Sequence, residues 1–180
     1  CAVPAEGVIE TFVRGRTLEG IVDANQKVDR AVRGAAMAIG ATVEIETTPG
    51  NLPQTNDPTM SELRGENVKS LYGEDQFFIE EHRTGSTDMG DLGHIMPVTH
   101  PYIFGASGSG HGNDYLMEDK EAVYVNMAKL LAMTAIDVLG DNSRKGREIL
   151  SSVRPKLTKE EYLQFNRDLM QTTRFTPDTE

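Results

Sequence analysis

Residues 7–48 alternate between strand-like and helix-like patterns, and this alternation limits what the chain can fold into. Residues 8–13 are rich in β-branched and aromatic side chains and predict a strand that ends at Arg14. Apolar residues then recur at helical spacing over residues 18–39, with Thr17 as a helix N-cap. Over residues 43–47 they alternate with polar residues, which is typical of a half-buried strand. Two strands and one helix form too small a core to stand alone, so we expect half of a larger α+β module.

A second, larger unit is expected after this module, which makes the fold class α/β. Residues 49–58 are rich in Pro, Gly and Asn and predict a connector, with a domain boundary at about residue 50. A helix should run from Asp57 or Thr59 to about Leu71, and residues 77–81 predict a short strand. We therefore divide the chain into residues 1–50 and 51–180.

The clearest helical pattern covers residues 120–139. Its apolar residues occupy much of the helix circumference, which predicts burial against a sheet. A capping box from Thr158 to Glu161 predicts a last helix to about Met170, and we expect the tail after Thr172 to fray.

The charge balance excludes some classes of partner. With 18 Lys and Arg against 28 Asp and Glu, the net charge is 18 − 28 = −10. A chain this acidic is unsuited to bind nucleic acid or an anionic membrane surface. No apolar run approaches the ~20 residues of a membrane span. The single cysteine, Cys1, excludes an internal disulfide and favours a reducing compartment, so a cytoplasmic location is expected.

The glycine-rich run at residues 105–112, Gly-Ala-Ser-Gly-Ser-Gly-His-Gly, is the strongest candidate for a site. It follows an extended segment and precedes the apolar helix, where ligands bind in many α/β proteins. Its glycines let the backbone approach a ligand closely, and the imidazole of His111 is a natural metal ligand. Two alternatives stay open: a flexible loop with an incidental histidine, and a phosphate-binding loop. The phosphate loop lacks the Lys-Ser/Thr pair that normally follows.

Two further positions are candidate substrate contacts. Residues 85–91, Gly-Ser-Thr-Asp-Met-Gly-Asp, place Asp88 in a loop that we expect near the same cleft. The structural alternative is that Ser86 or Thr87 caps a short helix that ends at about His94. Arg14, at the end of the first predicted strand, could clamp a carboxylate in two-pronged geometry, or be an ordinary exposed charge. His82, His94 and His100 show no paired ligand spacing, so a surface or core role is expected for them.

Taken in order, three segments resemble the aminoacylase/carboxypeptidase (M-twenty) family of di-metal peptidases and amidohydrolases. These segments are residues 3–15, 85–97 and 108–114, which begin with Val-Pro-Ala-Glu, Gly-Ser-Thr-Asp and Gly-Ser-Gly-His. The closer likeness is to the branch that acts on N-acyl amino acids, including aminobenzoyl-glutamate and auxin-conjugate hydrolases. The resemblance covers nearly the whole chain.

This resemblance implies a fold, a cofactor and a set of site residues. Residues 1–50 would be the second half of a ferredoxin-like lid that commonly mediates dimerisation, and residues 51–180 the C-terminal part of the catalytic domain. His111 matches the family's C-terminal metal ligand, and Arg14 the lid arginine that holds the substrate carboxylate. Asp88 and Gly110 would also line the substrate site. The complete enzyme would hold two divalent ions, zinc or manganese/cobalt.

The same resemblance places the remaining metal ligands and the general-base Glu in an N-terminal half that this chain lacks. We therefore expect the chain to be inactive by itself, within an enzyme that hydrolyses an amide bond in N-acyl amino acids or short peptides. Cys1 stands where many relatives have Asn in the substrate site, which is a departure from the family pattern. Two rival functions remain: an amino-acid-binding regulatory module without catalysis, and a nucleotide-binding protein.

Overall fold

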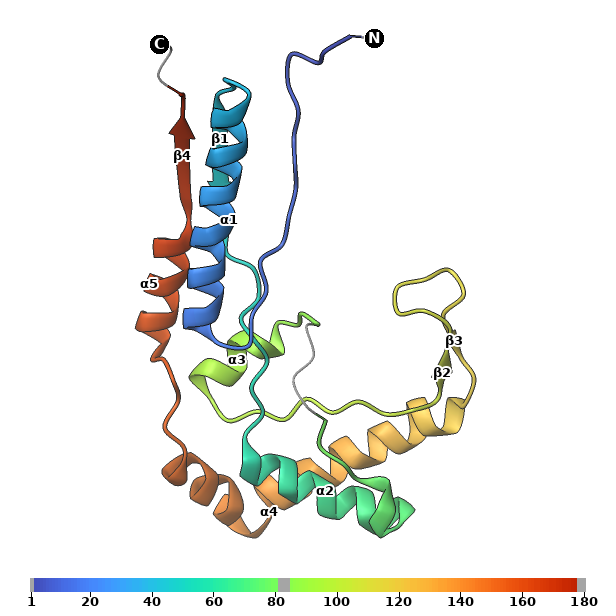
Figure 1. The fold of residues 1–180 in the computed structure, drawn as a ribbon. Coiled ribbons are helices and arrows are strands. Elements are labelled where there is room, and N and C mark those ends of the chain that lie inside the picture. Colours follow the sequence, from blue (N-terminus) through green and yellow to red (C-terminus); the bar gives the residue numbers. More distant parts are fainter. Residues whose placement is uncertain (1, 81–84, 178–180) are drawn as a thin grey trace.

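The computed structural model describes residues 2–80 and 85–177, and shows a mixed α/β chain of helices with two small sheets (Figure 1). Its elements in chain order are α1 (Leu18–Ala38), β1 (Val43–Thr47), α2 (Pro58–Tyr72), the short 3-10 helix η1 (Glu74–Gln76), α3 (Met89–Ile95), β2 (Ala106–Ser107), β3 (Leu116–Met117), the π-helical turn η2 (Glu121–Asn126), α4 (Met127–Ser152), α5 (Lys159–Leu169) and β4 (Gln171–Phe175).

The chain is arranged in two lobes with α3 between them (Figure 1). In one lobe β1 pairs antiparallel with β4, from Val43 opposite Phe175 to Thr47 opposite Gln171, and α1 packs against β1. The expectation that the tail after Thr172 frays is therefore wrong for residues 173–175. The backbone groups of the tail are satisfied by pairing with β1, a partner 124 to 132 residues away that local patterns do not reveal.

The strand expected over residues 8–13 is not formed. This segment is extended but pairs with no other segment in the described parts of the chain, and Figure 1 shows it running alone toward the N-terminus. Its apolar side chains lie in solvent, with Ile9 88% exposed. High β-propensity cannot form a strand without a neighbour to supply hydrogen bonds. The expected β-α-β unit is instead α1 and β1 with β4 from the far end of the chain.

The helix starts follow the capping residues that the sequence predicts. The Thr17 hydroxyl oxygen accepts a hydrogen bond from the Gly20 N–H (3.0 Å), and Asp57 Oδ1 accepts one from the Met60 N–H (2.8 Å). At α5 the capping box is complete, because the Thr158 N–H donates to Glu161 and the Glu161 N–H donates to Thr158. The hydrogen bond from the Thr158 N–H to the Glu161 carboxylate, and secondarily the Thr158 hydroxyl, lower the pKa of Glu161.

In the second lobe α2 packs against α4. Along α4 only Leu130, Thr134 and Ile149 are buried, whereas Leu131 and Ile136 are more than half exposed. The expectation that this helix is buried against a sheet is wrong for the described residues, because the only sheets among them are the two short ribbons. Helical geometry breaks at residues 140–143, directly after the predicted end at Leu139.

The stretch from Glu121 to Ser152 is long and apolar enough, by length and composition, to cross a membrane. The expectation from the sequence considers only continuous apolar runs, so it does not identify this stretch as a candidate membrane span. Core helices of soluble proteins meet the same criterion, so a single such helix is weak evidence for a membrane protein.

The short strand expected over residues 77–81 is also absent from residues 77–80; Glu81 lies outside the described residues. Phe77 instead turns back onto α2 after η1. A Cβ on Gly65 would stand 2.6 Å from the Phe77 ring, so the aromatic ring lies directly on the bare backbone of that glycine. Packing of the Phe77 ring on α2 therefore determines the conformation here, although the segment has high β-propensity.

Helix α3 joins the two lobes through its glycines. A Cβ on Gly90 would overlap the Leu52 carbonyl oxygen, and a Cβ on Gly93 would overlap that of Thr55, so the connector backbone runs directly against α3. Polar groups complete the contact: Asp91 Oδ1 accepts from the Leu52 N–H (3.2 Å), and the Thr55 hydroxyl donates to the Gly93 carbonyl (3.0 Å).

The other side of α3 receives the segment that leads into α5. The Leu157 N–H donates to the His94 carbonyl oxygen (3.0 Å). Burial, and then the negative charge of Asp91, raises the pKa of the Tyr162 phenol on α5. Helix α3 is thus held by the connector on one side and by the C-terminal segment on the other.

We predict that Gly90→Ala destabilises the chain by at least about 2 kcal/mol, because a methyl group there must displace the Leu52 backbone. The matched control is Gly34→Ala in α1, where the new methyl group meets nothing within 4 Å. It should raise stability by about 0.5–1 kcal/mol through helix propensity. Urea unfolding followed by circular dichroism measures both changes. Equal stabilities for the two variants would contradict the close contact at Gly90.

Candidate functional site

The glycine-rich run forms the loop of a short hairpin that precedes η2. Strands β2 and β3 pair antiparallel, with Ala106 opposite Met117 and Ser107 opposite Leu116. The Ser107 hydroxyl also donates to Glu118 Oε1 (2.7 Å), which ties the two sides together. The Gly105 carbonyl oxygen accepts from the N–H groups of Glu118 and Asp119 (2.9 and 3.0 Å), so the base of the hairpin is joined to the start of the helix.

Inside the loop, Asp114 and two glycines set the turn. Asp114 Oδ1 accepts a hydrogen bond from the Ser109 N–H (3.3 Å), and the Gly112 N–H donates to the Ser109 carbonyl (2.7 Å). Gly108 has φ +81°, and a Cβ there would overlap the Asp114 carbonyl oxygen. The glycines therefore serve the tight turn itself, and the loop presents His111 in a defined backbone conformation.

His111 stands at the exposed end of this loop with φ +63°, a conformation that is uncommon for a residue with a side chain. Among residues 2–80 and 85–177, no group of three His, Cys, Asp or Glu side chains could hold a metal ion. A protein metal site normally needs three or four ligands. The described residues therefore do not form a metal site by themselves, and His111 stays a single candidate ligand.

Arg14 is exposed on the extended N-terminal segment, and its guanidinium carbon lies 5.7 Å from the centroid of the Phe12 ring. Figure 1 shows that segment and the β2–β3 hairpin well apart. The structure does not bring Arg14 and His111 together within this chain. Gly110 lies beside His111 in the loop and is exposed, and a Cβ added to it would meet nothing within 4 Å.

The loop of residues 85–91 divides into an exposed part and a structural part. Asp88 is exposed, and one of its oxygens accepts a hydrogen bond from the Thr87 hydroxyl (3.3 Å). The Met89 N–H donates to Thr87 Oγ1 (3.3 Å), so the Thr87 hydroxyl accepts a hydrogen bond from the first residue of α3, whereas the N-cap residue is Asp88, whose side chain forms no capping hydrogen bond. Gly90 and Asp91 hold the connector. Asp88 is the exposed charged residue of this run, and its role as a substrate contact stays a prediction.

The remaining histidines show why a lone histidine is weak evidence for a site. His94 is 1% exposed, and its Nδ1 donates to the Gly90 carbonyl (2.9 Å), so it is a satisfied core residue as expected. His100 is half-buried and packs edge-on against Tyr102, with ring centroids 5.4 Å apart. His82 and Cys1 lie outside the described residues.

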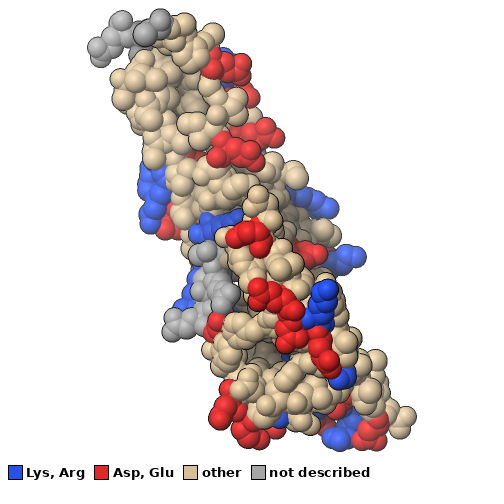
Figure 2. All heavy atoms as spheres, turned by 90° about the vertical axis from the view of Figure 1, so that its right-hand side faces the viewer, with Lys and Arg blue, Asp and Glu red and all other residues tan. Residues whose placement is uncertain are grey.

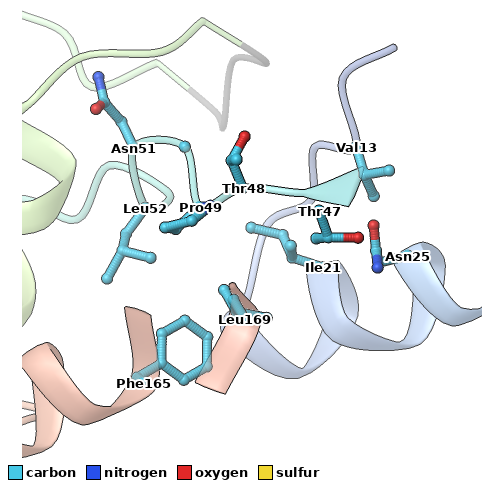
Figure 3. A pocket seen from close by; sticks show the side chains of 11 residues that line it. Val13, Ile21, Asn25, Thr47, Thr48, Pro49, Asn51, Leu52, Phe165 and Leu169 are labelled. Carbon is cyan, nitrogen blue, oxygen red and sulfur yellow. The ribbon is translucent and has the colours of Figure 1, made fainter. Parts of the chain in front are cut away.

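A small pocket of about 80 Å³ lies where α1, the end of β1, the connector and α5 meet (Figure 3). Figure 3 shows Phe165 and Leu169 of α5 facing Ile21 of α1 and Leu52 of the connector. Its lining residues are Val13, Ile21, Asn25, Thr47, Thr48, Pro49, Gly50, Asn51, Leu52, Phe165 and Leu169. This set contains no titratable side chain. The pocket is a packing seam between helices and offers no acid or base for catalysis.

On the face shown in Figure 2, acidic and basic side chains are interspersed, and the coloured residues form no broad basic patch. The described residues also form ion pairs between sequence neighbours, such as Lys27 with Asp23 (2.6 Å) and Arg144 with Asp141 (2.7 Å). These pairs are exposed and contribute little to stability.

The chain is similar to two dipeptidases. It is 28% identical over 148 residues to the Xaa-Arg dipeptidase of Mus musculus, which covers 76% of this chain and 34% of the relative. It is 28% identical over 151 residues to the Xaa-Arg dipeptidase of Homo sapiens, which covers 76% of this chain and 33% of the relative. The similarity supports a peptidase or amidohydrolase family, and the chain spans about one third of the length of these relatives. No family model matches the chain, and no solved structure matches it.

We predict that Gly108→Ala disorders the loop that carries His111, because Gly108 has φ +81° and the methyl group would overlap the Asp114 carbonyl. Gly110→Ala is the matched control, since its methyl group enters open space. Amide hydrogen exchange measured by NMR should show protection lost around Ser109 and Gly112 in the first variant and kept in the second. Unchanged protection in Gly108→Ala would show that the loop does not depend on this turn.

Proposed function

We propose that this chain is part of a metal-dependent hydrolase that cleaves the amide bond of short peptides or N-acyl amino acids. The observation that carries the proposal is the similarity to two Xaa-Arg dipeptidases over 76% of the chain. The ordered set of motifs around Arg14, Asp88 and His111 supports the same class of enzyme. Dipeptides, including those with a C-terminal arginine, are the first substrates to test.

The complete enzyme would supply what the described residues lack. The relatives are about three times as long as the matched region, so further ligands and a general-base carboxylate would come from residues that this chain does not contain. In that enzyme His111 is one ligand of a site for two divalent ions, zinc or manganese/cobalt. Such ions, when bound, activate a water molecule and polarise the amide carbonyl.

This chain's own residues would position the substrate. A guanidinium binds a carboxylate with two parallel hydrogen bonds, so Arg14 would hold the carboxylate end of the substrate in one orientation. Gly110 leaves the backbone next to His111 open to close approach. Asp88 precedes α3 with its carboxylate exposed and could contact the acyl part or the amine of a dipeptide.

Residues 1–50 are proposed as the second half of a ferredoxin-like lid, and residues 51–180 as the C-terminal part of the catalytic domain. The unpaired extended segment at residues 8–13 supports this assignment, because its exposed apolar side chains would be covered by the other strands of a complete lid sheet. A lid of this kind would also mediate a homodimer, with the enzyme acting in the cytoplasm.

We predict that the isolated chain shows no amide hydrolysis, whereas the complete enzyme cleaves dipeptides and loses activity when a chelator removes the metal. His111→Ala in the complete enzyme should lower kcat/KM by at least about 100-fold if the histidine is a metal ligand. Metal content measured by mass spectrometry should fall in the same variant. Metal-dependent hydrolysis by the isolated chain would refute its assignment as an incomplete enzyme.

Arg14→Met in the complete enzyme should raise KM by about 10- to 100-fold for substrates with a free carboxylate, because one charged hydrogen-bonded contact is removed. Substrates with the carboxylate amidated should show little difference between wild type and variant. Arg16→Met is the matched control, since Arg16 is also exposed and two residues away. An equal loss for both kinds of substrate would contradict a carboxylate contact. Binding of amino acids without any hydrolysis would favour a regulatory module.

A further inference from the structure

Arg64 is a buried cation in the contact between α2 and α4. It is 3% exposed, whereas Arg30 of α1 and Arg144 of α4 are exposed and Arg33 of α1 is half-buried. Arginine is almost never fully buried unless its charge is paired, because removing an ion from water costs on the order of several kcal/mol. A buried arginine in a protein interior therefore normally faces a carboxylate or another anion.

The described residues do not give Arg64 such a partner. Its Nε is buried without a hydrogen-bond acceptor, and one Nη atom contacts the Met127 sulfur at 3.4 Å, which is a weak acceptor. Burial lowers the pKa of the guanidinium. Close by on α2, the side-chain amide of Asn67 donates a hydrogen bond to Asp137 Oδ2 of α4 (2.7 Å). This carboxylate of the α2–α4 contact is thus engaged by an amide, and no ion pair with Arg64 is found among the described residues.

We propose that Arg64 is an anchor for a carboxylate group that the described residues do not supply. The fork of a guanidinium matches a carboxylate in two-pronged geometry, and the free Nε is one of the two donors that such a contact uses. The site is built into a helix–helix contact, so its position is set by packing and not by a mobile surface side chain.

The carboxylate could come from an Asp or Glu elsewhere in the complete protein, or from a small carboxylic acid in solution. The first source rests on the proposed function, in which about two thirds of the enzyme lies outside this chain. The low exposure of Arg64 favours it over a freely diffusing acid, because a packed protein segment supplies its carboxylate together with the burial of its surroundings.

The test compares thermal unfolding of wild type and Arg64→Met in two proteins, this chain and the complete enzyme. In this chain the substitution removes an unpaired buried charge, so the midpoint should rise by about 2–4 °C. In the complete enzyme it leaves a buried carboxylate without its cation, so the midpoint should fall by at least as much. Arg30→Met, at an exposed position of α1, controls for the change in net charge. Arg64→Lys keeps the charge and should not raise the midpoint of this chain.

A second arm identifies the source. Sodium acetate, compared with sodium chloride at equal ionic strength, is the probe for a small carboxylate. A rise in midpoint that wild type shows and Arg64→Met lacks would support the site with a solution acid as its ligand. The reversal of sign between the two proteins would support it with a carboxylate from the protein.

The proposal is overturned if Arg64→Met lowers the midpoint of this chain, or if it raises both midpoints and acetate has no specific effect. If Arg64→Met does not fold, the acetate arm on wild type and Arg64→Lys decides, and no acetate effect on either would overturn the proposal. These readouts are independent of catalysis. A complete protein without amidase activity that still shows the sign reversal would refute the proposed function and leave the role of Arg64 standing.

Discussion

The close approach of two backbones at α3 is the contact on which the arrangement of the lobes depends. Gly90 and Gly93 leave no space for a side chain against the connector, so the connector takes a single path past the helix. Asp91 then satisfies the Leu52 N–H in the same contact. Because His94 receives the C-terminal segment on the other side, one seven-residue helix orients the β1–β4 lobe relative to the α2–α4 lobe. The run that carries Asp88 therefore has a structural role, since its residues Gly90 and Asp91 bind the connector.

Local signals in the sequence predict the elements that are stabilised locally. The starts of α1, α2 and α5 follow from Thr17, Asp57 and Thr158, because a capping side chain acts within three residues. Features that need a distant partner could not be predicted in this way. The strand at residues 8–13 requires a neighbouring strand that the described residues lack. Strand β4 forms because it pairs with β1. The sheet expected beneath α4 fails for the same reason.

The candidate site also has a locally stabilised part and a part that needs distant residues. The turn around His111 is set by Gly108, Gly112 and Asp114, all within a few residues, and the structure shows an ordered loop where the sequence also left a flexible loop open. A metal site requires ligands from several distant segments, and the described residues bring no such group together. Arg14 and His111 belong to different parts of the structure, and this chain does not bring them together. A resemblance to a family predicts that convergence, whereas the residue pattern alone does not.

Three unrelated costs in this structure would have one physical explanation under the proposed function. The exposed apolar side chains of residues 8–13 and of α4 lose hydrophobic burial, and the unpaired guanidinium of Arg64 loses its solvation without a compensating charge. If these surfaces faced solvent in the working protein, polar side chains would be expected at residues 8–13 and on the exposed face of α4. An apolar side chain would be expected in place of the buried Arg64. All three costs vanish together if a further part of the enzyme covers these surfaces and brings a carboxylate. The similarity to dipeptidases three times as long as the matched region supports the same view by an independent route.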